Sequence, residues 1–142
     1  MAADNMQASG KTVILQVDDD ETLCEFMSVR LTRINYEVLT ANSGKEALKI
    51  LEDHKVDLAI IDVSMPGMSG YELLKHMKKK APEVPVILLT GYRDDSNLHM
   101  SLEVGCNSFI EKPVTFETLA FTIDRVLQAR KPGDIRQLKK AA

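Results

Sequence analysis

Residues 57–74, DLAIIDVSMPGMSGYELL, decide the fold of this chain. A short apolar run ends at Asp62, and a loop containing Pro66 and Gly67 follows. A run of this length, bounded by turn residues, favours a strand that is buried on both faces. Ser69 and Glu72 then match the S-x-x-E capping box, which marks the first turn of a helix. The segment therefore predicts a buried strand with a carboxylate at its carboxyl end, a tight loop and a helix.

The same order of elements recurs along the chain. A second capping box stands at Ser43 to Glu46, and residues with helical spacing separate the apolar runs. Five β-α units predict an α/β fold, with a doubly wound parallel sheet and helices on both faces. We expect residues 1–10 to be a flexible arm, 11–130 the folded domain, and 131–142 a polar tail or the start of a linker. The expected strands are 13–17, 36–39, 56–61, 86–89 and 108–110, and the expected helices lie around Leu23–Ile34, Ala47–Leu51, Leu73–Met77, Leu98–Leu102 and Phe116–Leu127.

Composition excludes several classes of protein. The 142 residues suit one domain, and a formal charge of -3 lacks the basic surplus of a nucleic-acid binder. Cys24 and Cys106 lie far apart, without the spacing of a disulfide scaffold or a zinc site, which fits a reducing compartment. No apolar run approaches the ~20 residues of a membrane span, and the first ten residues do not resemble a signal peptide. We therefore expect a cytoplasmic protein that binds neither nucleic acid nor membrane directly.

Chemically active side chains follow four of the expected strands. The first strand runs into Asp18, Asp19 and Asp20, and the others into Asp62, Thr90 and Lys112. Ligands of open α/β sheets bind at this carboxyl edge. Carboxylates brought together there repel one another unless a cation intervenes, and Mg²⁺ prefers such oxygen ligands and shares them with phosphate. The pattern predicts a Mg²⁺-dependent site that handles a phosphoryl group, in which the lysine and the threonine contact phosphoryl oxygens.

The segments ILQVDDDE, DLAIIDVSMPGMSGYELL, VILLTGY and FIEKPV together resemble the receiver domain of two-component response regulators. The resemblance covers about residues 11–130 and implies a flavodoxin-like strand order, 2-1-3-4-5. It also implies that Asp62 is the phosphoacceptor, and that Mg²⁺ is held by Asp18, Asp19, Asp62 and the main-chain carbonyl of Ser64. Thr90 and Lys112 match the residues that contact the phosphoryl oxygens, and Phe109 matches an aromatic side chain that rotates when the domain switches.

The resemblance further implies a signalling domain, not an enzyme, which assists only its own phosphorylation and dephosphorylation. The phosphoryl donor would be the phosphohistidine of a histidine kinase or of a phosphotransfer protein. Phosphorylation would reshape the surface formed by the helix around Leu98, strand 108–110 and helix 116–127, and a phosphorylation-dependent homodimer is a further expectation. The downstream effector cannot be identified from the sequence. We also expect a cis peptide bond between Lys112 and Pro113, where the chain must reverse sharply.

An enzyme is the alternative interpretation. Residues 18–22, DDDET, resemble the nucleophile motif of haloacid-dehalogenase-type phosphatases, in which Asp18 would be the nucleophile. That family needs a further acidic pair on a strand after the lysine, whereas Pro113 and a helix follow Lys112 here. The alternative also leaves Asp62 without a role. A receiver that acts only through protein contacts is disfavoured as well, because no acid, threonine or lysine is missing.

Ser64 and Tyr92 are expected to set the lifetime of the phosphorylated form, because the residues at these positions flank the approach of water to phosphorus in similar proteins. Tyr92 is bulky and shields the phosphorus, while Ser64 offers no amide or carboxylate to orient a water molecule. Autodephosphorylation should therefore be slower than in relatives with Asn or Glu at these places. In a decay measurement with Mg²⁺, Tyr92→Ala and Ser64→Asn should both lose phosphate faster than wild type. If neither does, the lifetime is set elsewhere.

Overall fold

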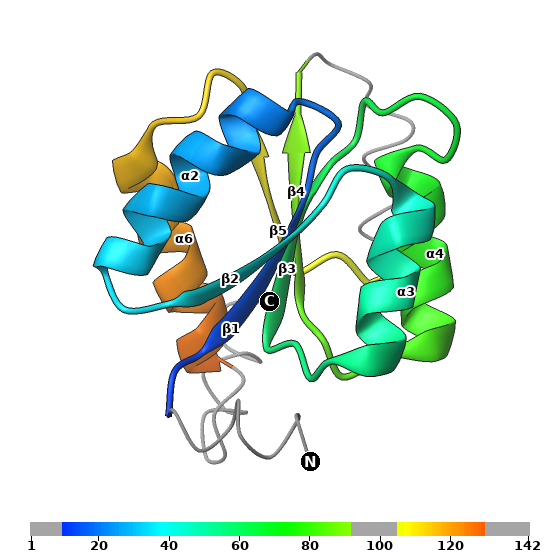
Figure 1. Ribbon diagram of the computed structural model, residues 1–142, viewed down its shortest axis with the longest axis horizontal. Coiled ribbons are helices and arrows are strands. Elements are labelled where there is room, and N and C mark those ends of the chain that lie inside the picture. The colour runs from blue at the N-terminus through cyan, green and yellow to red at the C-terminus, as the bar shows by residue number, and fades with distance from the viewer. Residues whose placement is uncertain (1–9, 92–104, 130–142) are drawn as a thin grey trace.

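The computed structural model describes residues 10–91 and 105–129 (Figure 1). Most of the expected arm, the tail, Tyr92 and the helix expected around Leu98 and Leu102 lie outside these residues, and the domain limits stay a prediction. The described elements, in chain order, are β1 (Val13–Val17), α2 (Glu21–Arg33), β2 (Glu37–Ala41), α3 (Gly44–Asp53), β3 (Leu58–Asp62), α4 (Gly70–Lys80), β4 (Val86–Thr90), β5 (Ser108–Glu111) and α6 (Phe116–Ala129).

The five strands form one parallel sheet in the order β2-β1-β3-β4-β5, which confirms the predicted fold. Four strands extend beyond the apolar runs that predicted them. They continue through Ala41, Asp62, Thr90 and Glu111, because the ladder of main-chain hydrogen bonds persists where the side chains become polar. Asp62 and Thr90 are thus the last residues of their strands and have the rigidity of the sheet.

Two hydrophobic layers cover the sheet. Helices α3 and α4 lie on one face, and α2 and α6 on the other (Figure 1). Side chains alternate across the interior strand β1, so that Leu15 packs in the layer with Leu73 and Leu74 of α4. Ile14 packs in the other layer, which contains Leu31 of α2 and Ile123 of α6. Burial on both faces explains why the central strands read as continuous apolar runs.

Side chains cap the four helices that the structure describes. Ser69 forms the predicted capping box: its hydroxyl accepts from the Glu72 N–H, and the Glu72 carboxylate accepts from the Ser69 N–H at 3.0 Å. The box predicted at Ser43 is only half correct. Ser43 caps α3, but the Glu46 carboxylate accepts from the N–H of Asn42, one residue earlier, at 2.8 Å. Glu46 thereby fixes the loop between β2 and α3.

Helix α4 begins in close contact with the carboxyl end of β3. The N–H of Gly70 donates to the carbonyl of Val63 at 3.1 Å. A Cβ atom added at Gly70 would lie 2.5 Å from the carbonyl oxygen of Asp62 and 2.6 Å from Cα of Val63. Both neighbours are main-chain atoms, so they cannot move aside as a flexible side chain can. Position 70 therefore requires glycine to keep the end of β3 in place.

The Gly70→Ala variant should lower the free energy of unfolding by about 1–3 kcal/mol, the usual effect of over-packing. Urea unfolding measures this change. Gly91→Ala is the matched control, because an added Cβ at Gly91 has open space around it. That variant should be as stable as wild type or slightly more stable, since alanine restricts the unfolded chain. Equal stability of the two variants would contradict the close packing of α4 against β3.

Candidate functional site

The end of β1 forms a turn of three acidic residues, Asp18 to Asp20, here called the acidic turn. Asp18 is buried, with 7% of its surface exposed, whereas Asp19 is exposed. The Asp18 carboxylate accepts from the Asp20 N–H at 2.9 Å, which bends the chain back on itself. Asp20 is the N-cap of α2, where its carboxylate accepts from the Leu23 N–H.

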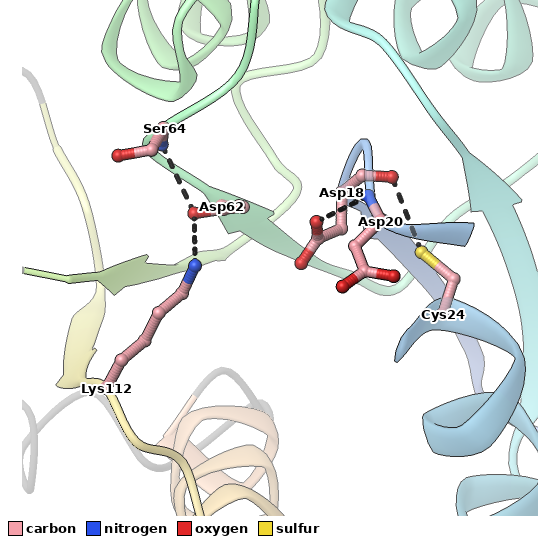
Figure 2. A network of polar contacts seen from close by, with 6 residues as sticks. All are labelled: Asp18, Asp20, Cys24, Asp62, Ser64 and Lys112. Atoms are coloured by element: carbon pink, nitrogen blue, oxygen red, sulfur yellow. Dashed lines mark hydrogen bonds and ion pairs between the residues drawn. The ribbon is translucent and has the colours of Figure 1, made fainter. Parts of the chain in front are cut away.

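Asp62, at the end of β3, accepts two contacts at one carboxylate oxygen. Its Oδ1 lies 2.9 Å from Nζ of Lys112 and 3.2 Å from the main-chain nitrogen of Ser64 (Figure 2). Only 3% of the Asp62 surface is exposed. Lys112 follows β5 directly, and its N–H donates to the Thr90 carbonyl at 2.8 Å. The Lys112–Pro113 peptide bond is cis, as predicted. The lysine is thus tied to the ends of β4 and β5 while its ammonium group reaches β3.

Carboxylate oxygens of Asp18, Asp19 and Asp62 lie within 4.8 Å of one another. The sheet brings them together because β1 and β3 are neighbours, so their carboxyl ends meet at one edge. Three hard oxygen donors, one of them on an exposed residue, suit a cation that keeps several of its waters, as Mg²⁺ does. The donor set therefore fits Mg²⁺.

The electrostatics of Asp18 support the same conclusion. The pKa of this carboxyl is raised to about 6, chiefly by burial, and the neighbouring negative charges of Asp62 and Asp19 contribute to the rise. The hydrogen bond from the Asp20 N–H and the positive charge of Lys112 act in the opposite direction but do not offset the burial. The pocket thus carries an excess of negative charge that a divalent cation would neutralise.

The remaining expected site residues lie close by in the sheet. Thr90 is the last residue of β4, with 4% of its surface exposed, and it pairs in register with Glu111. Phe109, on the neighbouring edge strand, is 42% exposed. Ser64 contacts Asp62 through its N–H, and the role expected for its carbonyl stays a prediction. Tyr92 lies outside the described residues.

Sequence reasoning missed Asn42, which lies in the loop after β2. Its side-chain amide donates to the main-chain carbonyl of Asp18 at 3.0 Å. Cys24 is buried, and its thiol also lies 3.5 Å from the same carbonyl. Contacts between a side chain and a distant main-chain carbonyl leave no pattern in the sequence, so no signal identified either residue as part of the site.

The family model of the response regulator receiver domain matches residues 14–124. Among curated relatives, the phosphate regulon transcriptional regulatory protein PhoB of Pseudomonas aeruginosa is 35% identical over 88% of this chain and 55% of its own length. The curated relatives are longer proteins, since this chain spans between 29% and 55% of their lengths. The comparisons give no support to the haloacid-dehalogenase-type alternative.

Solved structures agree in fold. A CheY-like receiver domain from Methanospirillum hungatei has a TM-score of 0.82 and 33% identity, over 84% of this chain and 96% of its own. The response regulator TrrA of Thermotoga maritima, solved in complex with Mg²⁺ and BeF, has a TM-score of 0.73 and 32% identity, over 81% of this chain and 98% of its own. With the strand order and acidic pocket described above, these matches show that the chain belongs to the response regulator receiver domain family of two-component signalling.

Proposed function

We propose that Asp62 takes a phosphoryl group from the phosphohistidine of a histidine kinase or of a phosphotransfer protein, in a Mg²⁺-dependent reaction. The placement of the Asp62 carboxylate carries this proposal. It is buried at a strand end, Lys112 and the Ser64 N–H both contact its Oδ1, and the carboxylates of Asp18 and Asp19 lie close by. No other carboxylate among the described residues has both this ammonium contact and this acidic neighbourhood.

The chain's own residues then have distinct tasks. Asp18, Asp19, Asp62 and the Ser64 carbonyl would hold Mg²⁺, which when bound supplies charge neutralisation at the phosphoryl oxygens. A carboxylate oxygen of Asp62 attacks phosphorus in line with the bond to the donor histidine. The new P–O bond forms as the P–N bond breaks, and the electron pair of the P–N bond stays on the imidazole nitrogen. The ammonium group of Lys112 lies near enough to Asp62 to stabilise the negative charge on the phosphoryl oxygens as well.

Switching is the second part of the proposal. The Thr90 hydroxyl would be drawn to the phosphoryl group, which vacates space for Phe109 to rotate inward from its exposed position. Phenylalanine has no hydroxyl to anchor the inward rotamer, so packing alone would hold it. The surface around residues 98–102, β5 and α6 would then change shape and present itself to an effector or to a second copy of the domain.

Membership of the family supports the proposal about partners and location. Receiver domains of response regulators are phosphorylated by histidine kinases, and they act as signalling modules, although some relatives of this chain are named as cyclic di-GMP phosphodiesterases. Among the described residues, no helix has the length and apolar character to cross a membrane. We propose a cytoplasmic domain that catalyses only its own phosphorylation and dephosphorylation and that does not itself contact nucleic acid.

The Asp62→Asn variant should not be labelled by acetyl phosphate and Mg²⁺, because a neutral amide is not a nucleophile towards phosphorus. Intact-mass spectrometry measures the labelled fraction. Asp20→Asn is the matched control: asparagine caps a helix as well as aspartate does, and Asp20 lies outside the cluster of three carboxylates. This control should be labelled as fully as wild type. Full labelling of Asp62→Asn would show that the phosphoacceptor is another residue.

Mg²⁺ affinity should depend on the protonation of Asp18, whose pKa is about 6 in the metal-free protein. Binding requires the carboxylate, so affinity at pH 5 should be about tenfold weaker than at pH 7 and should level off above pH 7. Calorimetric titration at several pH values tests this dependence, and an affinity independent of pH would contradict it.

Without Mg²⁺, the free energy of unfolding should fall as pH rises from about 4 to 6, because the folded state then binds more protons than the unfolded state.

A further inference from the structure

The acidic turn is tied to the end of the edge strand β2 through both main-chain groups of Asp18. The Asp18 N–H donates to the Ala41 carbonyl at 3.1 Å, and the Asp18 carbonyl accepts from Nδ2 of Asn42 at 3.0 Å. Sγ of Cys24, in the first turns of α2, lies 3.5 Å from the same carbonyl (Figure 2). Because a thiol is a weak donor, the amide of Asn42 is the principal contact.

Asn42 is itself held in place before its side chain reaches Asp18. Its N–H donates to the Glu46 carboxylate at 2.8 Å, and the next residue, Ser43, caps α3. Glu46 departs from the usual capping box to make this contact. A continuous path of hydrogen bonds therefore runs from α3, through Asn42, to the end of β1.

The contacted carbonyl belongs to the peptide unit that joins Asp18 to Asp19. The orientation of this unit determines where the exposed Asp19 leaves the sheet, and hence how close its carboxylate lies to Asp62. Three carboxylates within 4.8 Å of one another repel, which pushes the turn to open whenever no cation is bound. A neutral donor on the carbonyl resists this opening without cancelling the charge that attracts the cation.

We propose that Asn42 is a positioning residue for the Mg²⁺ site, and that its amide holds the acidic turn closed over Asp62 before the cation arrives. This inference rests on the proposed function of the pocket. Asn42 acts through the main chain of Asp18 and carries no charge, so it contributes geometry and not attraction. Replacing it by another neutral residue changes the position of the carboxylates while it leaves the net charge unchanged.

The Asn42→Ala variant should bind Mg²⁺ about fivefold more weakly than wild type, which corresponds to about 1 kcal/mol, the net contribution of one hydrogen bond. Calorimetric titration of the folded protein measures this directly. Labelling by acetyl phosphate should slow by a similar factor at low Mg²⁺ and should recover to the wild-type rate at saturating Mg²⁺. This split between affinity and rate would not arise if Asn42 served only to stabilise the fold.

Asn107→Ala is the matched control. The side chain of Asn107 also forms a hydrogen bond with a main-chain group: its Oδ1 accepts from the Val86 N–H at 2.9 Å. This contact lies at the amino ends of the strands, whereas the acidic turn lies at their carboxyl ends. This variant also loses one hydrogen bond of the fold, yet its Mg²⁺ affinity should equal that of wild type. If Asn42→Ala proves too unstable to titrate, Asn42→Ser, whose side chain is too short to reach Asp18, makes the same test.

The outcomes separate the two proposals. If wild type binds Mg²⁺ and is labelled on Asp62, and the Asn42 variants bind Mg²⁺ as tightly as wild type, the positioning role is wrong and the proposed function stands. An equal loss of affinity in Asn42→Ala and Asn107→Ala also overturns the positioning role, because the effect would then follow stability alone. If wild type itself neither binds Mg²⁺ nor is labelled, the proposed function fails first.

Discussion

Repulsion among three carboxylates is the constraint around which this site is built. Asp18, Asp19 and Asp62 share a small, partly buried space in which their charges are weakly screened. The pKa of Asp18 is raised to about 6, chiefly because the carboxyl is buried and in smaller part because the charges of Asp62 and Asp19 lie close to it. Each neighbouring contact offsets part of the repulsion: Lys112 faces Asp62, and the N–H groups of Asp20 and Ser64 point at carboxylate oxygens. The site is thus unfavourable in isolation and depends on the rest of the fold to hold it together.

The topology of the sheet supplies that support. Placing β1 between β2 and β3 brings the acidic turn beside Asp62 on one side and beside the loop after β2 on the other. Hydrophobic layers on both faces fix the three strands, so the turn is anchored to a rigid edge. Close contact of Gly70 with the end of β3 removes a further freedom of movement. The geometry of the pocket therefore depends on the packing of the helices against the two faces of the sheet.

Much of this architecture could be predicted from the sequence, because parallel strands buried on both faces leave continuous apolar runs, and four of these runs lead into a carboxylate, a hydroxyl or an ammonium group. The positions of Asp18, Asp62, Thr90 and Lys112 followed from that pattern. The path of a loop could not be predicted in the same way. The Glu46 carboxylate accepts a hydrogen bond from the N–H of Asn42 instead of that of Ser43, and the Asn42 amide donates to a carbonyl 24 positions away in the chain. Both contacts depend on the path of the loop in three dimensions.

The choice of partners for Asp18 explains how such a pocket can be rigid and still attract a cation. A lysine or arginine paired with this carboxylate would hold it in place. It would also neutralise the negative charge and compete with Mg²⁺ for the same oxygens. Instead, the contacts described at Asp18 come from neutral donors: the Asp20 N–H, the Asn42 amide and the Cys24 thiol. The last two bind the carbonyl and leave the carboxylate oxygens accessible to an ion. Main-chain hydrogen bonds thus fix the position of the charge, while its neutralisation is left to the metal.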